Sequence, residues 1–113
     1  MKISLNDISA VPTSHKAGMK RVRLSARESG CALTQIAITD MKAGEIADAH
    51  FHADMQEGFY VLSGELDFIL DGAVEHCTAE DFVYVKDGAS HELRAITDVK
   101  VLTIGCETNL VHD

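Results

Sequence analysis

The sequence predicts an all-β protein in which many short strands form a sandwich or a barrel. Apolar and polar residues alternate over short runs rich in valine, isoleucine, phenylalanine and tyrosine, which is typical of half-buried strands. Turn-forming residues separate these runs at intervals of about eight to twelve residues. The chain has one proline, Pro12, and no proline- or glycine-rich tract, so no linker divides it.

The clearest strand patterns cover residues 32–38, 58–64, 65–70, 81–86 and 98–105. Turns are expected at 42–44, 63–65, 71–72 and 86–88, because each contains glycine beside polar or charged residues. Asp71-Gly72 is the strongest of these signals, since Asp-Gly between two strands suits a type I′ hairpin with positive φ at both residues. Residues 3–9 and 25–29 carry a weak helical pattern.

Length and composition indicate one soluble globular domain over residues 1–113, with 46% hydrophobic and 25% charged residues. The N-terminus lacks the apolar segment of a signal peptide, and no run approaches the roughly 20 apolar residues of a membrane span. We therefore expect a cytoplasmic protein with no membrane partner.

Charge and cysteine content narrow the function classes. The formal net charge of −8 disfavours binding to phosphate backbones, so nucleic acid is not an expected partner. Cys31, Cys77 and Cys106 are widely separated and odd in number, which argues against a disulfide framework or a cysteine zinc site. We expect them to be buried or half-buried free thiols.

The segment HFHADMQEGFYVLSG, residues 50–64, is the candidate site. In a strand, His50 and His52 would face the same side about 6.6 Å apart, close enough for both imidazoles to bind one metal ion. Glu57 would share a face of the next strand with Phe59 and Val61, where a carboxylate needs a positive partner such as a divalent cation. A His-x-His pair alone is also compatible with surface or core histidines.

These residues resemble the motifs of the cupin superfamily. The first motif is glycine, five residues, His-x-His, three or four residues, glutamate, six residues and glycine, and it is matched throughout by Gly44, His50, His52, Glu57 and Gly64. Of the second motif the chain keeps Gly88 and His91, whereas Glu80, Lys86 and Ala95 replace a glycine, a proline and an asparagine. The resemblance spans residues 32–105 and implies a double-stranded β-helix, or jelly-roll barrel, preceded by an N-terminal arm over 1–31.

The resemblance implies that His91 is a fourth ligand beside His50, His52 and Glu57, with Fe, Mn, Ni, Cu or Zn as the candidate metals. Four protein ligands leave two positions open on a six-coordinate ion, enough for a small oxygenated metabolite. Phe59, Val61, Leu93 and Met55 are the expected pocket residues. The resemblance also implies a homodimer.

Other histidines and the one basic cluster are expected to lie outside the site. We expect His76 to lie on the surface and His15 and His112 to be solvated near the termini. Lys20, Arg21 and Arg23 predict an exposed strand or arm, with anchoring of an acidic substrate or a partner subunit as the alternative.

Three functions stay open at this point. The first is a metal-dependent enzyme, dioxygenase-like or isomerase-like, and the second is a non-catalytic module that binds a small molecule or the metal itself. The third is a scaffold with a vestigial site, which the retained glutamate disfavours because a buried carboxylate without a ligand role is costly.

Overall fold

A computed structural model of the chain describes all residues except 1, 5–6, 14–16, 26–28, 30 and 109–113. Over these described residues the regular structure is nearly all β-strand, with Asp7 in 3₁₀ and Ser29 in α-helical conformation. In chain order the strands are β1 (Val11–Pro12), β2 (Met19–Ser25), β3 (Leu33–Met41), β4 (Ile46–His50), β5 (Met55–Ser63), β6 (Leu66–Leu70), β7 (Ala73–Cys77), β8 (Phe82–Val85), β9 (His91–Ala95) and β10 (Val99–Glu107). Within the described residues, no helix is long and apolar enough to cross a bilayer.

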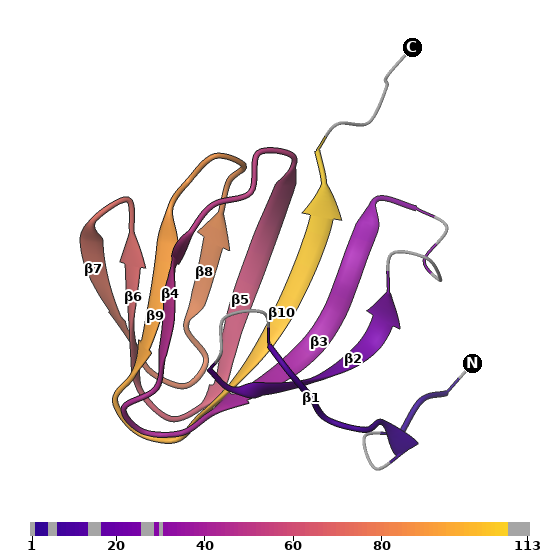
Figure 1. Cartoon of the computed structure of the whole chain (residues 1–113), viewed down its shortest axis with the longest axis horizontal. Helices are drawn as coiled ribbons and strands as arrows, with labels where there is room; N and C mark the ends of the chain where they lie inside the picture. The colour runs from indigo at the N-terminus through magenta and orange to yellow at the C-terminus, as the bar shows by residue number, and fades with distance from the viewer. Residues whose placement is uncertain (1, 5–6, 14–16, 26–28, 30, 109–113) are drawn as a thin grey trace.

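The strands form two antiparallel sheets that face each other (Figure 1). The larger sheet has the order β1-β2-β3-β10-β5-β8, and the smaller has the order β4-β9-β6-β7. Because β4 and β5, β5 and β6, and β9 and β10 are consecutive in the chain but lie in different sheets, the chain crosses repeatedly between the layers. This arrangement is a double-stranded β-helix, as expected.

The apolar core lies between the two sheets. Phe68 and Leu66 of β6, in the smaller sheet, and Val61 and Val101 of β5 and β10, in the larger, are almost fully buried. The rings of Phe59 and Phe68 meet across the core at a centroid distance of 5.0 Å. Each sheet therefore buries the inward-facing half of its alternating residues against the other.

The expected turns occur where the sequence placed them. Asp71 and Gly72 both have positive φ, 48° and 83°, at the tip of the β6–β7 hairpin. Gly44, Gly64 and Gly88 also adopt positive φ, which glycine tolerates without steric cost.

The structure confirms one of the open expectations and corrects others. The strand alternative for the basic cluster Lys20, Arg21 and Arg23 is confirmed, because residues 19–25 form β2, which pairs with β3 in the larger sheet and is half-buried over most of its length. Of the weakly helical segment 25–29, Ser25 instead ends β2 and Ser29 is helical, whereas residues 26–28, like 5–6 of the segment 3–9, lie outside the described residues. The cysteines are free, but Cys31 is exposed, because it lies in a bend before β3 and not in a strand.

Candidate metal centre

His50 reaches the interior because β4 contains a β-bulge. Ala47 pairs with Leu93 and His50 pairs with His91, so two residues of β4, Asp48 and Ala49, lie opposite one residue of β9, Glu92. The extra residue reverses the alternation, and Ala47 and His50 therefore both face the cavity between the sheets although two residues, and not one, lie between them. His50 Nδ1 lies 2.9 Å from the carbonyl oxygen of Asp48, which orients the ring.

His52 lies in the loop between β4 and β5 and not in a strand with His50, as the sequence had suggested. The alternation nevertheless continues past the end of β4, because Phe51 is 64% exposed while His50 and His52 on either side line the cavity. A backbone hydrogen bond of 2.7 Å from Gly88 N to His52 O fixes this loop against the turn before β9.

Glu57 and His91 supply the buried half of the group. Glu57 is the third residue of β5 and is 7% exposed, and His91 begins β9 and is 1% exposed. The His91 ring lies nearly parallel to that of Phe68, with centroids 6.1 Å apart. Core packing therefore holds both side chains in place.

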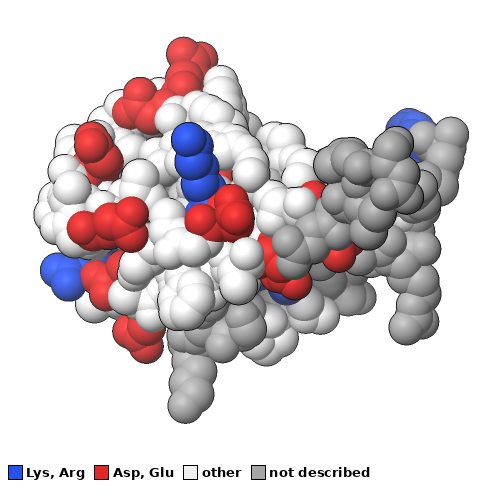
Figure 2. Space-filling view, turned by 90° about the horizontal axis from the view of Figure 1, so that it is seen from above, with Lys and Arg blue, Asp and Glu red and all other residues white. Residues whose placement is uncertain are grey.

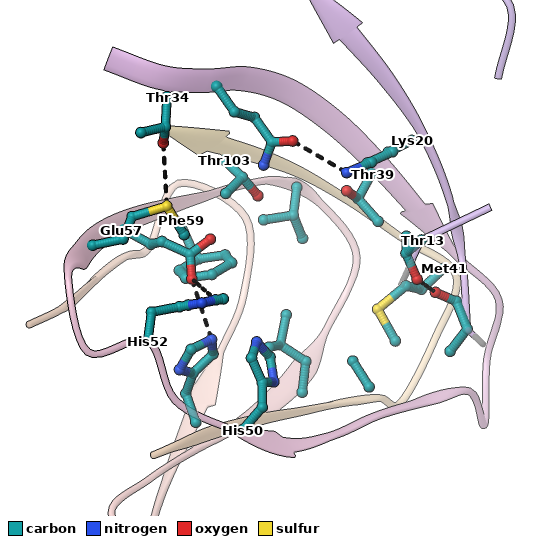
Figure 3. A pocket seen from close by; sticks show the side chains of 17 residues that line it. Thr13, Lys20, Thr34, Thr39, Met41, His50, His52, Glu57, Phe59 and Thr103 are labelled. Atoms are coloured by element: carbon teal, nitrogen blue, oxygen red, sulfur yellow. Dashed lines mark hydrogen bonds and ion pairs between the residues drawn. The ribbon is translucent and has the colours of Figure 1, made fainter. Parts of the chain in front are cut away.

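One potential ligand atom from each of His50, His52, Glu57 and His91 lies within 4.8 Å of every other. Metal–nitrogen bonds of about 2.0–2.1 Å give a coordination shell about 4 Å across, close to this separation. Glu57 Oε1 is 3.3 Å from His52 Nε2 and 3.3 Å from His91 Nε2, so the carboxylate lies between two imidazoles (Figure 3).

His91 and Glu57 leave two buried polar atoms without a hydrogen-bond partner. His91 Nδ1 lies 3.4 Å from the carbonyl oxygen of Ala89 on one side of the ring. On the other side, neither His91 Nε2 nor Glu57 Oε1 forms a properly directed hydrogen bond with any described residue, although both atoms are buried and lie 3.3 Å apart. A divalent cation bound by both atoms would satisfy them.

The electrostatics keep Glu57 ionised. Burial alone would raise the pKa of its carboxyl group, but the contact with His91 and the charges of His52, His91 and His50 outweigh burial and lower that pKa below its ordinary value. The carboxylate is thus the form present at neutral pH, as metal coordination requires.

The group lies at one end of a cavity of about 310 Å³. Figure 3 shows the side chains of His50, His52 and Glu57 converging at that end, with Lys20 and Thr39 on the wall beyond. The volume is at the lower limit of ligand pockets, which suits a small metabolite.

The structure separates the predicted pocket residues into two groups. Phe59, Leu93 and Met55 line the cavity, and the Met55 sulfur lies 3.2 Å from Thr34 Oγ1. Val61 shares the inward face of β5 but lies in the core and outside the cavity lining, because alternation fixes the side of a sheet and not the depth of a cavity.

The histidines outside the group do not approach it where the structure describes them. His76 is on the surface of β7, with Nδ1 3.0 Å from Asp67 Oδ1 and Nε2 3.2 Å from Glu65 Oε2. His15 and His112 lie outside the described residues.

Sequence reasoning missed most of the polar wall opposite the metal group. Besides Lys20, for which anchoring of an acidic substrate was one alternative, this wall contains Thr34, Gln35, Thr39 and Thr103. The buried Ala37 of β3 lies on the same face as Gln35 and Thr39, two residues away on either side. The buried Val101 of β10 likewise shares a face with Thr103. Polar residues on the buried face of a strand are the signal that would have identified them.

Comparison with known proteins agrees with this architecture. The Cupin domain family matches residues 37–105. A predicted oxalate decarboxylase from Thermotoga maritima has a TM-score of 0.87 at 22% sequence identity, covering 95% of this chain and 99% of that one. Ectoine synthase from P. lautus has a TM-score of 0.81 at 18% identity, covering 94% of this chain and 77% of the synthase chain. An RmlC-like cupin from Shewanella frigidimarina has a TM-score of 0.77 at 16% identity, covering 94% of this chain and 88% of that one.

At these identities the solved structures show a shared fold and nothing about activity. No curated protein sequence matches this chain.

Proposed function

Because the chain belongs to the cupin family, which matches it over residues 37–105, we propose that it is a metal-binding cupin acting on a small oxygenated metabolite. His50, His52, Glu57 and His91 hold a divalent transition-metal ion at the end of the cavity. The observation that carries the proposal is the convergence of the four side chains around the buried atoms Glu57 Oε1 and His91 Nε2, neither of which has a hydrogen-bond partner among the described residues.

The donor set suits Fe(II), Mn(II), Ni(II), Cu(II) or Zn(II), since neutral imidazoles and a carboxylate bind all of these ions. When bound, such an ion supplies Lewis acidity and open coordination positions for substrate oxygens. The reaction class that this supports is oxidation or isomerisation of a small keto, enol or carboxylate compound.

The protein's own residues position the ligand set and exclude water. The carbonyls of Asp48 and Ala89 fix the rings of His50 and His91 through Nδ1, which directs Nε2 of each ring into the cavity. Phe59 and Leu93 give the same end of the cavity an apolar surface. An apolar surface lowers the local dielectric constant, which strengthens interactions between the charged groups.

A non-catalytic binding module is the second candidate, and one observation favours it. Apart from the four ligand residues, Lys20 is the only titratable side chain among the described residues that line the cavity. The cavity therefore offers few groups for proton transfer beyond the metal ligands themselves.

Elemental analysis of untagged protein, before and after dialysis against a chelator, tests the metal centre. We expect near-stoichiometric metal in the wild type and loss of most of it in Glu57→Ala and His52→Ala. His76→Ala is the matched control, because His76 pairs with Asp67 and Glu65 on the surface and should leave the metal content unchanged.

Failure of the wild type to take up any of the five metals would refute the proposal. Equal metal retention in His52→Ala and His76→Ala would show that the ligands are wrongly assigned. With the metal known, oxygen-consumption and isomerase screens distinguish the enzyme from the binding module, because only an enzyme converts a compound that it binds.

A further inference from the structure

Lys20 places a positive charge in the wall of the cavity that holds the metal group. It lies on β2 and pairs with Thr39 of β3, so both side chains face the interior of the sandwich. Lys20 Nζ is 3.2 Å from Oε1 of Gln35, four residues before Thr39 on the same strand (Figure 3). Lys20, expected on an exposed strand or arm with anchoring of an acidic substrate or a partner subunit as the alternative, is thus half-buried on a strand and directed into the pocket.

This ammonium group has no acidic partner where the structure is described. Arg94 and Lys100 form ion pairs with Glu92 and Asp40, but no carboxylate of the described residues pairs with Lys20. Acidic residues outnumber basic ones, 18 to 10, and they are scattered over the face seen in Figure 2. An unpaired cation in a cavity of so acidic a protein loses part of its hydration, and an incoming anion would compensate for that loss.

The strand register aligns the ammonium group with the metal ligands. Gln35, which contacts Lys20, pairs with Gly105 of β10, and Gly105 pairs with Glu57 of β5. The backbones of Gln35 and Glu57 are therefore two strand spacings apart, roughly 10 Å. Where a side chain of Gly105 would lie, Thr34 Oγ1 and the Met55 sulfur come within 2.5 Å and 3.4 Å of its Cβ position, so these two side chains form the wall between the ammonium group and the carboxylate.

A β-bulge completes the polar wall. Gly105 pairs with Gln35 and Cys106 with Leu33, so Thr34 is an extra residue in β3. Because of this bulge, the neighbours Thr34 and Gln35 both line the cavity, where a regular strand would turn one of them outward. Gln35 and Thr39 add hydrogen-bonding groups beside Lys20, and Thr34 adds a hydroxyl nearer the metal group, next to the Met55 sulfur.

We infer that the substrate of the proposed metal centre is a short organic acid, with one carboxylate bound by Lys20 and an oxygen-bearing group directed to the metal. The inference rests on the proposed function, since the metal defines the second end of the ligand. A carboxylate fits better than a phosphate because the wall offers one cation and neutral side chains. Phosphate sites in proteins commonly add a helix N-terminus or an arginine fork, neither of which is present among the described lining residues.

Titration calorimetry on metal-loaded protein, with metal content measured in the same samples, tests this inference. The probes are succinate and glutarate, with succinamate and inorganic phosphate for comparison, and the variants are Lys20→Met and Lys20→Arg. We expect the dicarboxylates to bind the wild type more tightly than succinamate or phosphate. Lys20→Met should weaken dicarboxylate binding about ten- to hundred-fold, the effect of losing one charge-assisted hydrogen bond, and Lys20→Arg should weaken it less.

Lys100→Met is the matched control, because Lys100 pairs with Asp40 and does not line this cavity. Equal affinity in the wild type and Lys20→Met, absence of dicarboxylate binding, preference for phosphate, or loss of metal in Lys20→Met would each overturn the inference. The same titration on protein from which the metal has been removed with a chelator distinguishes a failure of this inference from a failure of the proposed metal centre. Binding that depends on Lys20 in a protein that takes up no metal would refute the metal centre and leave the anion site standing.

Discussion

Gly64, in the turn between β5 and β6, allows a sharp test of how the fold is held together. Its φ is +90°, and a Cβ at this position would lie 2.1 Å from the carbonyl oxygen of Asp98 and 2.8 Å from Cγ1 of Val99. A substitution to alanine therefore meets two separate obstacles, a left-handed backbone and a collision with the backbone before β10. Gly72→Ala isolates the first of these, because Gly72 has φ +83° and open space where its Cβ would be.

The left-handed conformation costs an L-residue about 1–2 kcal/mol, and alanine regains about 0.4–1 kcal/mol by restricting the unfolded chain. Gly72→Ala should thus lower the free energy of unfolding by about 1 kcal/mol. Gly64→Ala must also displace the Asp98 carbonyl, and overpacking of this kind adds about 1–3 kcal/mol. We expect a total loss of about 2–4 kcal/mol, a large part of the roughly 5–15 kcal/mol that stabilises a typical domain.

Urea unfolding followed by far-ultraviolet circular dichroism measures both variants against the wild type. An unchanged m-value would show that the difference reflects the native state and not a more compact unfolded state. Independent effects usually add to within about 0.5 kcal/mol. If the free energy of unfolding of Gly64→Ala is no more than about 0.5 kcal/mol below that of Gly72→Ala, the collision with Asp98 does not determine this turn.

Two further predictions concern the surface. The hydrogen bond from His76 to Asp67 and the charge of Glu65 raise the pKa of His76, so this cluster stabilises the protein below about pH 6.5, and the contribution is lost as the pH rises through the folded-state pKa. His76→Gln should therefore destabilise the protein more at pH 6 than at pH 8.5 in urea unfolding, and an equal effect at both values would contradict the assignment. We also predict a homodimer, because Phe82 and Tyr84 of β8 are exposed, at 57% and 47%, on the outer face of the larger sheet. Sedimentation of the wild type as a monomer at micromolar concentration would show that this prediction is wrong, whereas a dimer should dissociate in Phe82→Asp.

The regular parts of the fold could be predicted from the sequence because alternation reports burial directly. Glu57, Phe59 and Val61 are buried on one face of β5, as their spacing predicts, and Asp71 and Gly72 form the expected turn. Glu80 replaces a glycine of the second cupin motif yet adopts φ +77°, so the turn keeps its geometry at a conformational cost.

Features that depend on strand pairing could not be predicted. The sequence could not decide between an exposed Lys20 and one that anchors an acidic substrate, because nothing in its own segment reveals that it pairs with Thr39 inside the sandwich. The bulge at Thr34 inserts one residue into β3 without altering its composition. Whether Val61 lines the cavity or lies in the core also depends on the residues of the facing sheet, which its own strand does not reveal.

The bulge in β4 makes the ligand set tolerant of a change in chain length. One extra residue separates His50 from Ala47 relative to the partner strand, yet His50 still pairs with His91 and faces the metal group. Deleting that residue would restore regular pairing and leave His50 opposite His91 on the same inner face, since residues two apart in a regular strand point the same way. A protein with this fold can therefore absorb a single insertion or deletion between two inward-facing residues of β4 while every metal ligand keeps its place, an evolutionary route that a comparison of substitutions alone would overlook.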